Sequence, residues 1–445
     1  MSDIANPASS EQIVADVIDQ GKISAQQMLV VALCLFFNML DGFDITAMAV
    51  VASAVATELN LTPDKVGWIL STPLAGMMAG AMILAPVSDI IGRRKLIIIS
   101  ICLVGASIVV TANATSLAEF ILLRFISGMG AGAMLASQAT LAAEYSPEKY
   151  RALSVAVVTS GYPMGAMMTS VVADFIMPEY GWRGMFWFGG VFTLSMAFVA
   201  WALIPESLKF LFLRRPENAL ARVNGILGKM KKPILAEMPV VTTENKTKDS
   251  NVVQVVAKLL SPEHCTTTLT LWAAFFLCIS TLYFLMGWIP ALIEATGYSA
   301  SVGRDAFFRF NLGGVMGVYM MGWMSTRWKL STLIFVLSFS SAIGMVVFAY
   351  APNNLPLLMT LILIIGILQQ GGFTGFYAAA SKVYPTEIRS TGIGYAIGLG
   401  RLGAVAGPAI AGYLIVAGFD MSANFIFFAV PMAVGGFIAW RLQVR

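Results

Sequence analysis

The segment GMGAGAMLASQATLAAEYSPEKYR at residues 128–151 decides the fold, because the chain repeats it at residues 366–389 as GILQQGGFTGFYAAASKVYPTEIR. Three residue pairs keep one constant spacing between the copies: Gly128 with Gly366, Pro147 with Pro385, and Arg151 with Arg389. An earlier segment, APVSDIIGRRK at 85–95, returns in degraded form as GWMSTRWK at 322–329. The sequence therefore predicts two halves of the same architecture.

Composition places both halves in a membrane. Of the 445 residues, 58% are apolar and only 12% are charged, which is about half the charged share of an average soluble domain. A membrane-spanning helix needs about 20 mostly apolar residues. We predict an all-α integral membrane protein with twelve spans in two pseudo-symmetric six-helix bundles. The expected spans are 28–56, 65–88, 96–113, 117–143, 152–177, 183–204, 268–294, 303–325, 331–350, 354–381, 390–415 and 421–441.

The spans divide the chain into four parts: a tail at 1–27, a bundle at 28–204, a central loop at 205–267, and a second bundle with a short tail at 268–445. Leu220, Val223, Leu227 and Met230 recur at helical spacing, so the loop is expected to hold an amphipathic surface helix. With the N-terminus inside, most lysines and arginines fall on the cytoplasmic side. The positive-inside rule therefore places both termini in the cytoplasm.

Several function classes are disfavoured by what the sequence lacks. The net charge of +4 needs no nucleic-acid partner to explain it, and the single histidine, His264, lies in the central loop. The four cysteines form no CxxC pair, so packing roles are expected and no metal site or cofactor. No nucleotide-binding glycine-rich motif or catalytic constellation appears, which argues against a pump and an integral-membrane enzyme. The two-fold repeat without repeated pore loops argues against a channel.

The first span contains two acids, in FFNMLDGFD at 36–44. Asn38, Asp41 and Asp44 are spaced by three residues and drift slowly around one helix face. Each charged Asp costs about 2.5–3.5 kcal/mol at the centre of a membrane helix, so such residues face water or a cation. We interpret Asp41 and Asp44 as proton-coupling groups, with a purely structural pair as the alternative.

Three arginines inside spans are candidate partners. Arg124, in the fourth span, is the expected cation for the two acids, unless it is a helix-end anchor. Arg401, in the eleventh span, is the expected clamp for a substrate carboxylate, because its planar fork makes two parallel hydrogen bonds. Its alternative is an ion pair with Asp41 or Asp44. Arg309, in the eighth span, is a second candidate to bind the substrate anion, and its neutralisation by Asp305 one turn away is the alternative.

Several aromatic side chains could line a substrate site, and Asn38 is expected to contact the substrate as a polar group. The aromatic candidates are Tyr162, Tyr283, Phe284, Trp288, Phe373, Phe376, Tyr377 and Tyr395. Charged residues at the predicted cytoplasmic ends could form a gate whose ion pairs hold the outward-open state; they are Asp89, Arg93, Arg94, Glu144, Arg151, Glu387 and Arg389. Asp89, which follows the second span, is expected to accept hydrogen bonds from the positive N-terminal end of the eleventh helix, near residues 390–392. Ordinary positive-inside charges are the alternative.

These motifs resemble a known family. APVSDIIGRRK resembles the signature G-x-x-x-D-x-x-G-R-R of the major facilitator superfamily, with Ala85 in place of the first glycine. RFISGMGAG, with Arg124 in the matching position, and PESLKF are also similar to superfamily segments. LDGFD resembles the D-G-x-D of its aromatic acid:proton symporter branch, which imports benzoate-like acids.

The resemblance implies an alternating-access importer that takes up a benzoate or hydroxybenzoate together with a proton. A proton-coupled importer of a non-aromatic acid, such as a muconate-like diacid, is the alternative. The expected partners are the substrate, the proton and the lipid bilayer. A monomer in the bacterial inner membrane is expected.

Overall fold

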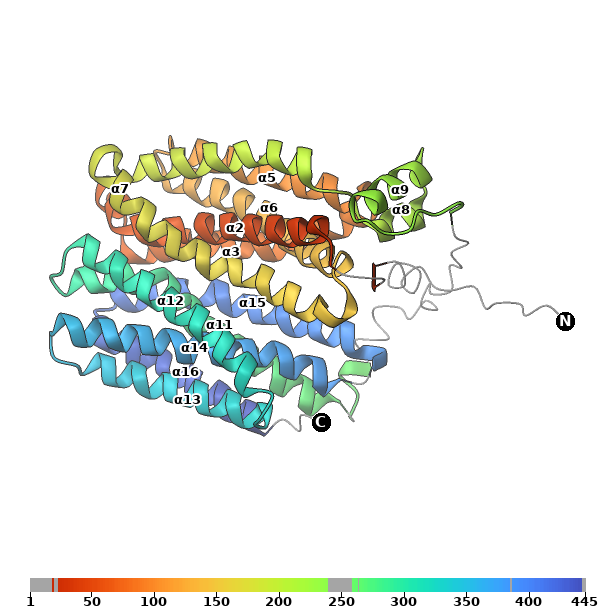
Figure 1. The fold of residues 1–445 in the computed structure, drawn as a ribbon. Helices are drawn as coiled ribbons and strands as arrows, with labels where there is room; N and C mark the ends of the chain where they lie inside the picture. Colours follow the sequence, from red (N-terminus) through yellow and green to blue (C-terminus); the bar gives the residue numbers. More distant parts are fainter. Residues whose placement is uncertain (1–17, 20–22, 239–257, 263, 385, 442–445) are drawn as a thin grey trace.

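A computed structural model describes residues 18–19, 23–238, 258–262, 264–384 and 386–441, without the side chains of residues 152, 381 and 386–391. Its secondary structure is helical, with no strand in the described part of the chain. The chain forms two helical bundles that lie side by side, the first coloured red to green and the second green to blue (Figure 1). This is the two-bundle architecture predicted from the repeat.

The first bundle contains six membrane crossings. The helices are α2 (Ala25–Glu58), α3 (Pro63–Ile83), α5 (Arg93–Thr111), α6 (Leu117–Glu144) and α7 (Glu148–Leu203), with the short η1 (Ala85–Val87) and α4 (Ser88–Ile91) after α3. Helix α7 has two legs, because Gly181 breaks it at φ 61° and ψ −165° shortly after Pro178. The legs match the fifth and sixth predicted spans.

The second bundle repeats this arrangement. Its helices are α11 (Cys265–Ala295), α12 (Ala300–Met324), α13 (Leu330–Ala349), α14 (Leu355–Val383), α15 (Thr386–Val416) and α16 (Met421–Trp440). Ten helices of the described chain are long and apolar enough to cross a membrane. With both legs of α7 and the more charged α12, they account for the twelve crossings.

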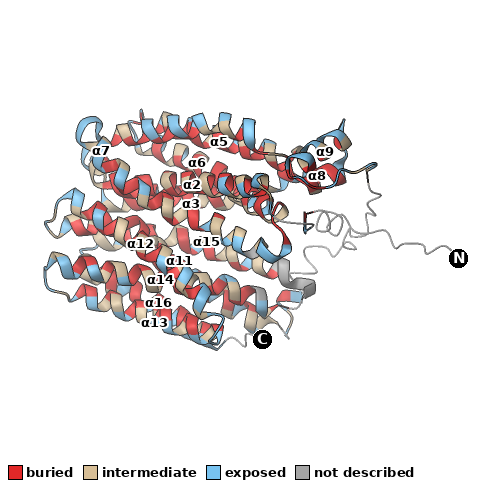
Figure 2. Cartoon of the chain, viewed as in Figure 1, coloured by how far each residue is buried: buried red, intermediate tan, exposed pale blue. Residues whose placement is uncertain are grey.

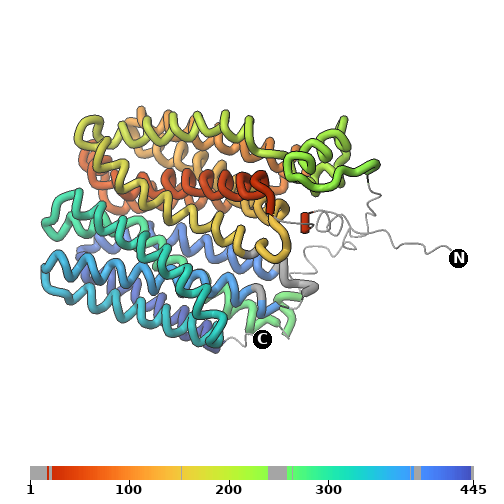
Figure 3. Tube along the Cα trace, viewed as in Figure 1, coloured from red at the N-terminus to blue at the C-terminus, as the bar shows by residue number. Residues whose placement is uncertain are grey.

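The predicted loop helix is present as α9 (Ala219–Lys229), which follows the short α8 (Leu208–Arg214). Val223, Leu227 and Met230 are buried, as the helical spacing indicated. Helices α8 and α9 lie beyond one end of the bundles, on the side where α2 begins (Figures 1 and 3). We call this the α8–α9 end and the opposite one the far end.

Buried residues concentrate where helices meet, and exposed residues follow the outer faces (Figure 2). Many large apolar side chains are exposed, including Phe175, Phe198 and Trp201. An apolar outer surface of this extent suits contact with lipid.

Within each bundle, small residues let helix backbones meet. A Cβ added to Gly42 of α2 would lie 2.1 Å from the backbone oxygen of Tyr162 in α7. In the second bundle, a Cβ on Gly403 or Gly407 of α15 would lie 2.2 Å from a backbone oxygen of α11. Small residues at such crossings are how membrane helices pack closely. The pairs α2–α7 and α11–α15 occupy equivalent places in the two halves.

The bundles meet along α3 with α15, α7 with α12, and α2 with α11. Two close approaches, of Gly67 to Pro408 and of Gly412 to Pro63, lie toward the far end, where α3 begins and α15 ends. The far end is therefore the closed end of the bundle interface.

We expect Gly42→Ala to lower the free energy of unfolding by about 1–3 kcal/mol, because its methyl group would overlap the Tyr162 carbonyl. Gly398→Ala is the matched control, since a Cβ there meets nothing within 4 Å. Thermal unfolding of the purified variants in detergent would measure both. Equal unfolding midpoints for the two variants would contradict the close packing at Gly42.

Candidate functional site

The two acids of the first span have different surroundings. Arg124 of α6 binds Asp44 twice, through Nη1 to Oδ1 at 2.6 Å and through Nη2 to the backbone oxygen at 2.6 Å. Ser127 donates to the other carboxylate oxygen, and the ring of Phe186 lies 5.7 Å from the guanidinium. Both charged side chains are 0% exposed. Both carboxylate oxygens of Asp44 are thus hydrogen-bonded inside the first bundle. Of these partners, the sequence suggested only Arg124.

Asp41 is equally buried but has no partner. It is 1% exposed, and neither carboxylate oxygen has a hydrogen-bond partner in the described structure. Asn38, one turn earlier, donates from Nδ2 to the backbone oxygen of Val158 at 2.6 Å and leaves its own Oδ1 unpaired. The spacing that puts Asp44 against α6 directs Asp41 toward α7, where Tyr162 lies within its electrostatic reach.

Arg401 approaches the same place from the second bundle. No acid of the described residues forms an ion pair with it, and its Nη1 is buried without a hydrogen-bond partner. It lies within electrostatic range of Tyr162, Tyr283 and Tyr377, which belong to α7, α11 and α14. We call Asp41, Tyr162, Tyr283, Tyr377 and Arg401 the central cluster.

The central cluster lies between the bundles and near the middle of most of its helices. Tyr162, Tyr283 and Arg401 are half-buried, and Tyr377 is 39% exposed. Tyr377 also packs edge-on against Phe275 and Phe373, at centroid distances of 5.5 and 5.1 Å. The cluster thus joins an unpaired cation, an unpaired acid and aromatic rings that solvent reaches.

Unpaired polar atoms make this cluster a candidate site for a ligand. A buried donor or acceptor without a partner costs about 1–3 kcal/mol, and more when it is charged. Such atoms are present here on Asp41 and Arg401. A guanidinium with a free nitrogen matches a carboxylate, and an unpaired acid can take up a proton.

Other predicted site residues lie outside the central cluster. Arg309 donates to Asp305 of its own helix at 3.0 Å, and both side chains are more than 40% exposed, so the local alternative describes it. Tyr395 stacks on Trp272 at 6.1 Å. Phe284 stacks on Phe428 and Phe376 packs on Phe275, while Trp288 donates to the backbone oxygen of Pro408.

Three of the predicted gate residues, Asp89, Arg93 and Glu144, form a network within one bundle at the α8–α9 end. Arg93 lies 3.3 Å from Glu144 and 3.5 Å from Asp89, and it donates to Ser207 at 3.0 Å. Tyr145 adds a hydrogen bond to the backbone of Glu206. The Asp89 side chain is 69% exposed in this state. The network therefore does not join the bundles among the described side chains.

Other gate predictions remain open. The side chains of Glu387 and Arg389, and the helix start proposed to meet Asp89, lie outside the described residues. Arg151 is half-buried and makes no ion pair with a described residue. Arg94 takes part through its backbone N–H, which donates to Glu206 at 3.1 Å.

Polar contacts do join the bundles toward the far end. Arg304 of α12 donates from Nε to Asp174 of α7 at 2.7 Å, and its Nη2 lies 2.6 Å from the same oxygen. Trp68 of α3 donates to the Tyr413 hydroxyl of α15 at 3.0 Å. Sequence reasoning missed both contacts, because their members are more than 100 residues apart and carry no shared motif.

Two pseudo-symmetric helical bundles, with unpaired charged groups at the interface between them and an ion pair that joins them toward the far end, have the architecture of a membrane transporter. The sequence pattern of the Major Facilitator Superfamily matches residues 31–352 and 271–445, and the chain belongs to that family. It is a transporter and not an enzyme.

Named relatives are similar over nearly the whole chain. A 4-hydroxybenzoate transporter of Pseudomonas putida is 29% identical over 98% of this chain and 96% of its own length. A gallate transporter of the same organism is 28% identical over 96% and 94%, and a benzoate transport protein of Acinetobacter baylyi is 27% identical over 96% and 92%. The inward-open xylose transporter XylE from E. coli has the same fold, with a TM-score of 0.73, 16% identity, and coverage of 94% of this chain and 96% of its own.

We expect Arg304→Gln to separate the bundles at the far end, because it removes a charged contact between α12 and α7. Spin labels on Thr57→Cys and Phe419→Cys, in a background without the four native cysteines, would report the distance across that end. The distance distribution should shift to longer values. Arg309→Gln is the control, since it removes the same charge from a pair within one helix. An unchanged distance distribution in Arg304→Gln would show that the Arg304–Asp174 ion pair does not hold the far end closed.

Proposed function

We propose that this transporter imports an aromatic monocarboxylate together with a proton, by alternating access. The observation that carries the proposal is the presence of Arg401 and Asp41 in one cluster but on different bundles, each with buried polar atoms that no described residue satisfies. Arg401 would bind the substrate carboxylate, and Asp41 would carry the proton. Asp44 is already held by Arg124 and Ser127, so we assign that pair to maintaining the bundle.

Charge balance explains why the two loads would travel together. An isolated charge enclosed within a membrane protein is costly. Substrate alone would neutralise Arg401 and leave Asp41 negative, and a proton alone would leave Arg401 positive. Only the fully loaded or the empty cluster has no net charge when the bundles close. One proton for each carboxylate follows from this balance.

The charges around the cluster favour an aromatic acid with one carboxylate over a diacid. A second carboxylate would need a second free cation, but Arg124 binds Asp44 and Arg309 binds Asp305. The exposed ring of Tyr377, which Phe275 and Phe373 hold in edge-on contact, could pack against a flat aromatic substrate. The relatives named for 4-hydroxybenzoate, gallate and benzoate support the same class.

Orientation follows from charge. The α8–α9 end carries Arg93, Arg94, Lys149 and the basic residues of α8 and α9, so the positive-inside rule places it in the cytoplasm. The closed far end would then face the outside, and the described state would be open to the cytoplasm. Import requires the reverse state as well, in which the Arg304–Asp174 contact opens.

We expect Asp41→Asn to abolish proton-driven accumulation and to retain substrate exchange, because an amide preserves shape but carries no proton. Uptake of labelled benzoate and 4-hydroxybenzoate into proteoliposomes, with and without a pH gradient, measures both activities. Wild-type uptake should rise as external pH falls and should cease to concentrate substrate when a protonophore is added.

Asp44→Asn is the comparison for that test. It should lower the free energy of unfolding by about 3–5 kcal/mol, because Arg124 is left buried without an acid. Full accumulation by Asp41→Asn at every pH would remove Asp41 from the proton path.

We expect Arg401→Lys to weaken binding of the acid at least about 30-fold, because an ammonium cannot reproduce the two-pronged contact and losing a desolvated charge partner costs about 2–5 kcal/mol. The methyl ester of the substrate should bind the wild type weakly and lose much less on substitution. Arg309→Lys, whose parent residue is paired locally, is the control. Equal losses for acid and ester would overturn the clamp.

A further inference from the structure

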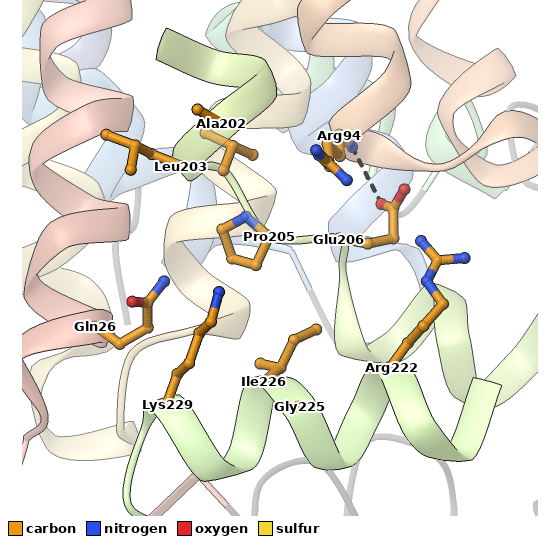
Figure 4. A pocket seen from close by; sticks show the side chains of 11 residues that line it. Gln26, Arg94, Ala202, Leu203, Pro205, Glu206, Arg222, Gly225, Ile226 and Lys229 are labelled. Atoms are coloured by element: carbon orange, nitrogen blue, oxygen red, sulfur yellow. Dashed lines mark hydrogen bonds between the residues drawn. The ribbon is translucent and has the colours of Figure 1, made fainter. Parts of the chain in front are cut away.

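A second basic pocket lies away from the central cluster, at the α8–α9 end. It has a volume of about 270 Å³ and is lined by the starts of α2 and α5, the segment that leaves α7, and one face of α9. Arg222 and Lys229 extend from α9 toward this segment, and Arg94 and Glu206 close the opposite side (Figure 4). The proposed transport reaction uses none of these side chains to contact substrate.

Three basic side chains and one acid, Glu206, line this pocket, and the acid already accepts hydrogen bonds from the backbone. Glu206 is 4% exposed and accepts backbone N–H groups of Arg94 and Ser207, so it caps the start of α5. Gly92 permits this cap, because it has φ 100° and a Cβ there would lie 2.3 Å from the Glu206 carboxylate. Glu206 thus caps the backbone of α5, and the three basic side chains leave the pocket with a net positive charge.

The cations have unused hydrogen-bonding capacity. Arg94 donates from Nη2 to the backbone oxygen of Trp201, but its buried Nε has no partner. Neither Arg222 nor Lys229 forms an ion pair with a described acid. The two residues are seven positions apart on α9, so they lie on the same face two turns from each other.

The pocket lies where the membrane surface is expected. Phe198, Trp201 and Leu203 are exposed apolar side chains at the end of the last crossing of the first bundle. Aromatic residues at crossing ends mark the headgroup level, and basic pockets at that level attract anionic lipids. A phosphate presented here could reach the two α9 cations and Arg94, which all line the pocket.

We propose that this pocket binds a phosphate-bearing anion, and that an anionic phospholipid headgroup supplies it. The phosphate accepts from Arg94, Arg222 and Lys229, and the acyl chains lie along the exposed apolar end of α7. Bound lipid would join α9 to the first bundle.

Native mass spectrometry of the full-length protein, titrated with phosphatidylglycerol, tests the proposal. The double variant Arg222→Gln/Lys229→Gln should bind that lipid about 30-fold more weakly than the wild type, which corresponds to about 2 kcal/mol for two basic side chains. The control, Arg327→Gln/Lys329→Gln, removes the same charge between α12 and α13 and should bind like the wild type.

Two further titrations distinguish the source of the phosphate. Phosphatidylcholine should bind weakly and equally to all three proteins. Inorganic phosphate could instead protect the wild type, but not the α9 variant, from thermal unfolding, while phosphatidylglycerol protects neither protein. That result would overturn the lipid assignment and identify a free anion as the ligand. Equal phosphatidylglycerol binding by the wild type and the α9 variant would overturn the site itself.

Discussion

The structure depends on helix backbones meeting without side chains between them. Gly42 rests on the carbonyl of Tyr162, and Gly403 and Gly407 rest on carbonyls of α11. Each crossing also positions the neighbouring functional group: Asp41 precedes Gly42, and Arg401 lies two residues before Gly403. Close packing and site geometry are therefore one constraint. Widening either crossing would move a cluster residue as well as lose contact area.

The first span shows how one helix can hold two acids of opposite character. Asp44 faces α6, where an arginine, a serine and a phenylalanine surround it. Asp41, three residues earlier, faces α7 and the second bundle, where no described group pairs with it. A buried ion pair is costly to break, whereas an unpaired acid can change its charge with little rearrangement. The first arrangement suits a scaffold and the second suits a switch.

Much of the fold was predictable, because repeat spacing and hydropathy are local properties. The break near Gly181 and the amphipathic α9 fell where the pattern placed them. The sequence also identified which charged residues lie inside the membrane spans. Their pairing was less so: the Arg309–Asp305 contact follows from i,i+4 spacing, but the choice of Asp44 over Asp41 by Arg124 depends on helix rotation. The Arg304–Asp174 contact depends on how two bundles meet, which no local pattern encodes.

The balanced charges of the central cluster have an electrical consequence. A carboxylate that crosses with one proton moves no net charge through the membrane, so the voltage across the bilayer does no work on the loaded carrier. The pH difference alone would set the limit of accumulation, at about tenfold for each pH unit, since one unit corresponds to about 1.4 kcal/mol. A cell with a large voltage and little pH difference would gain almost nothing from this protein. Its value would be greatest in acidic surroundings.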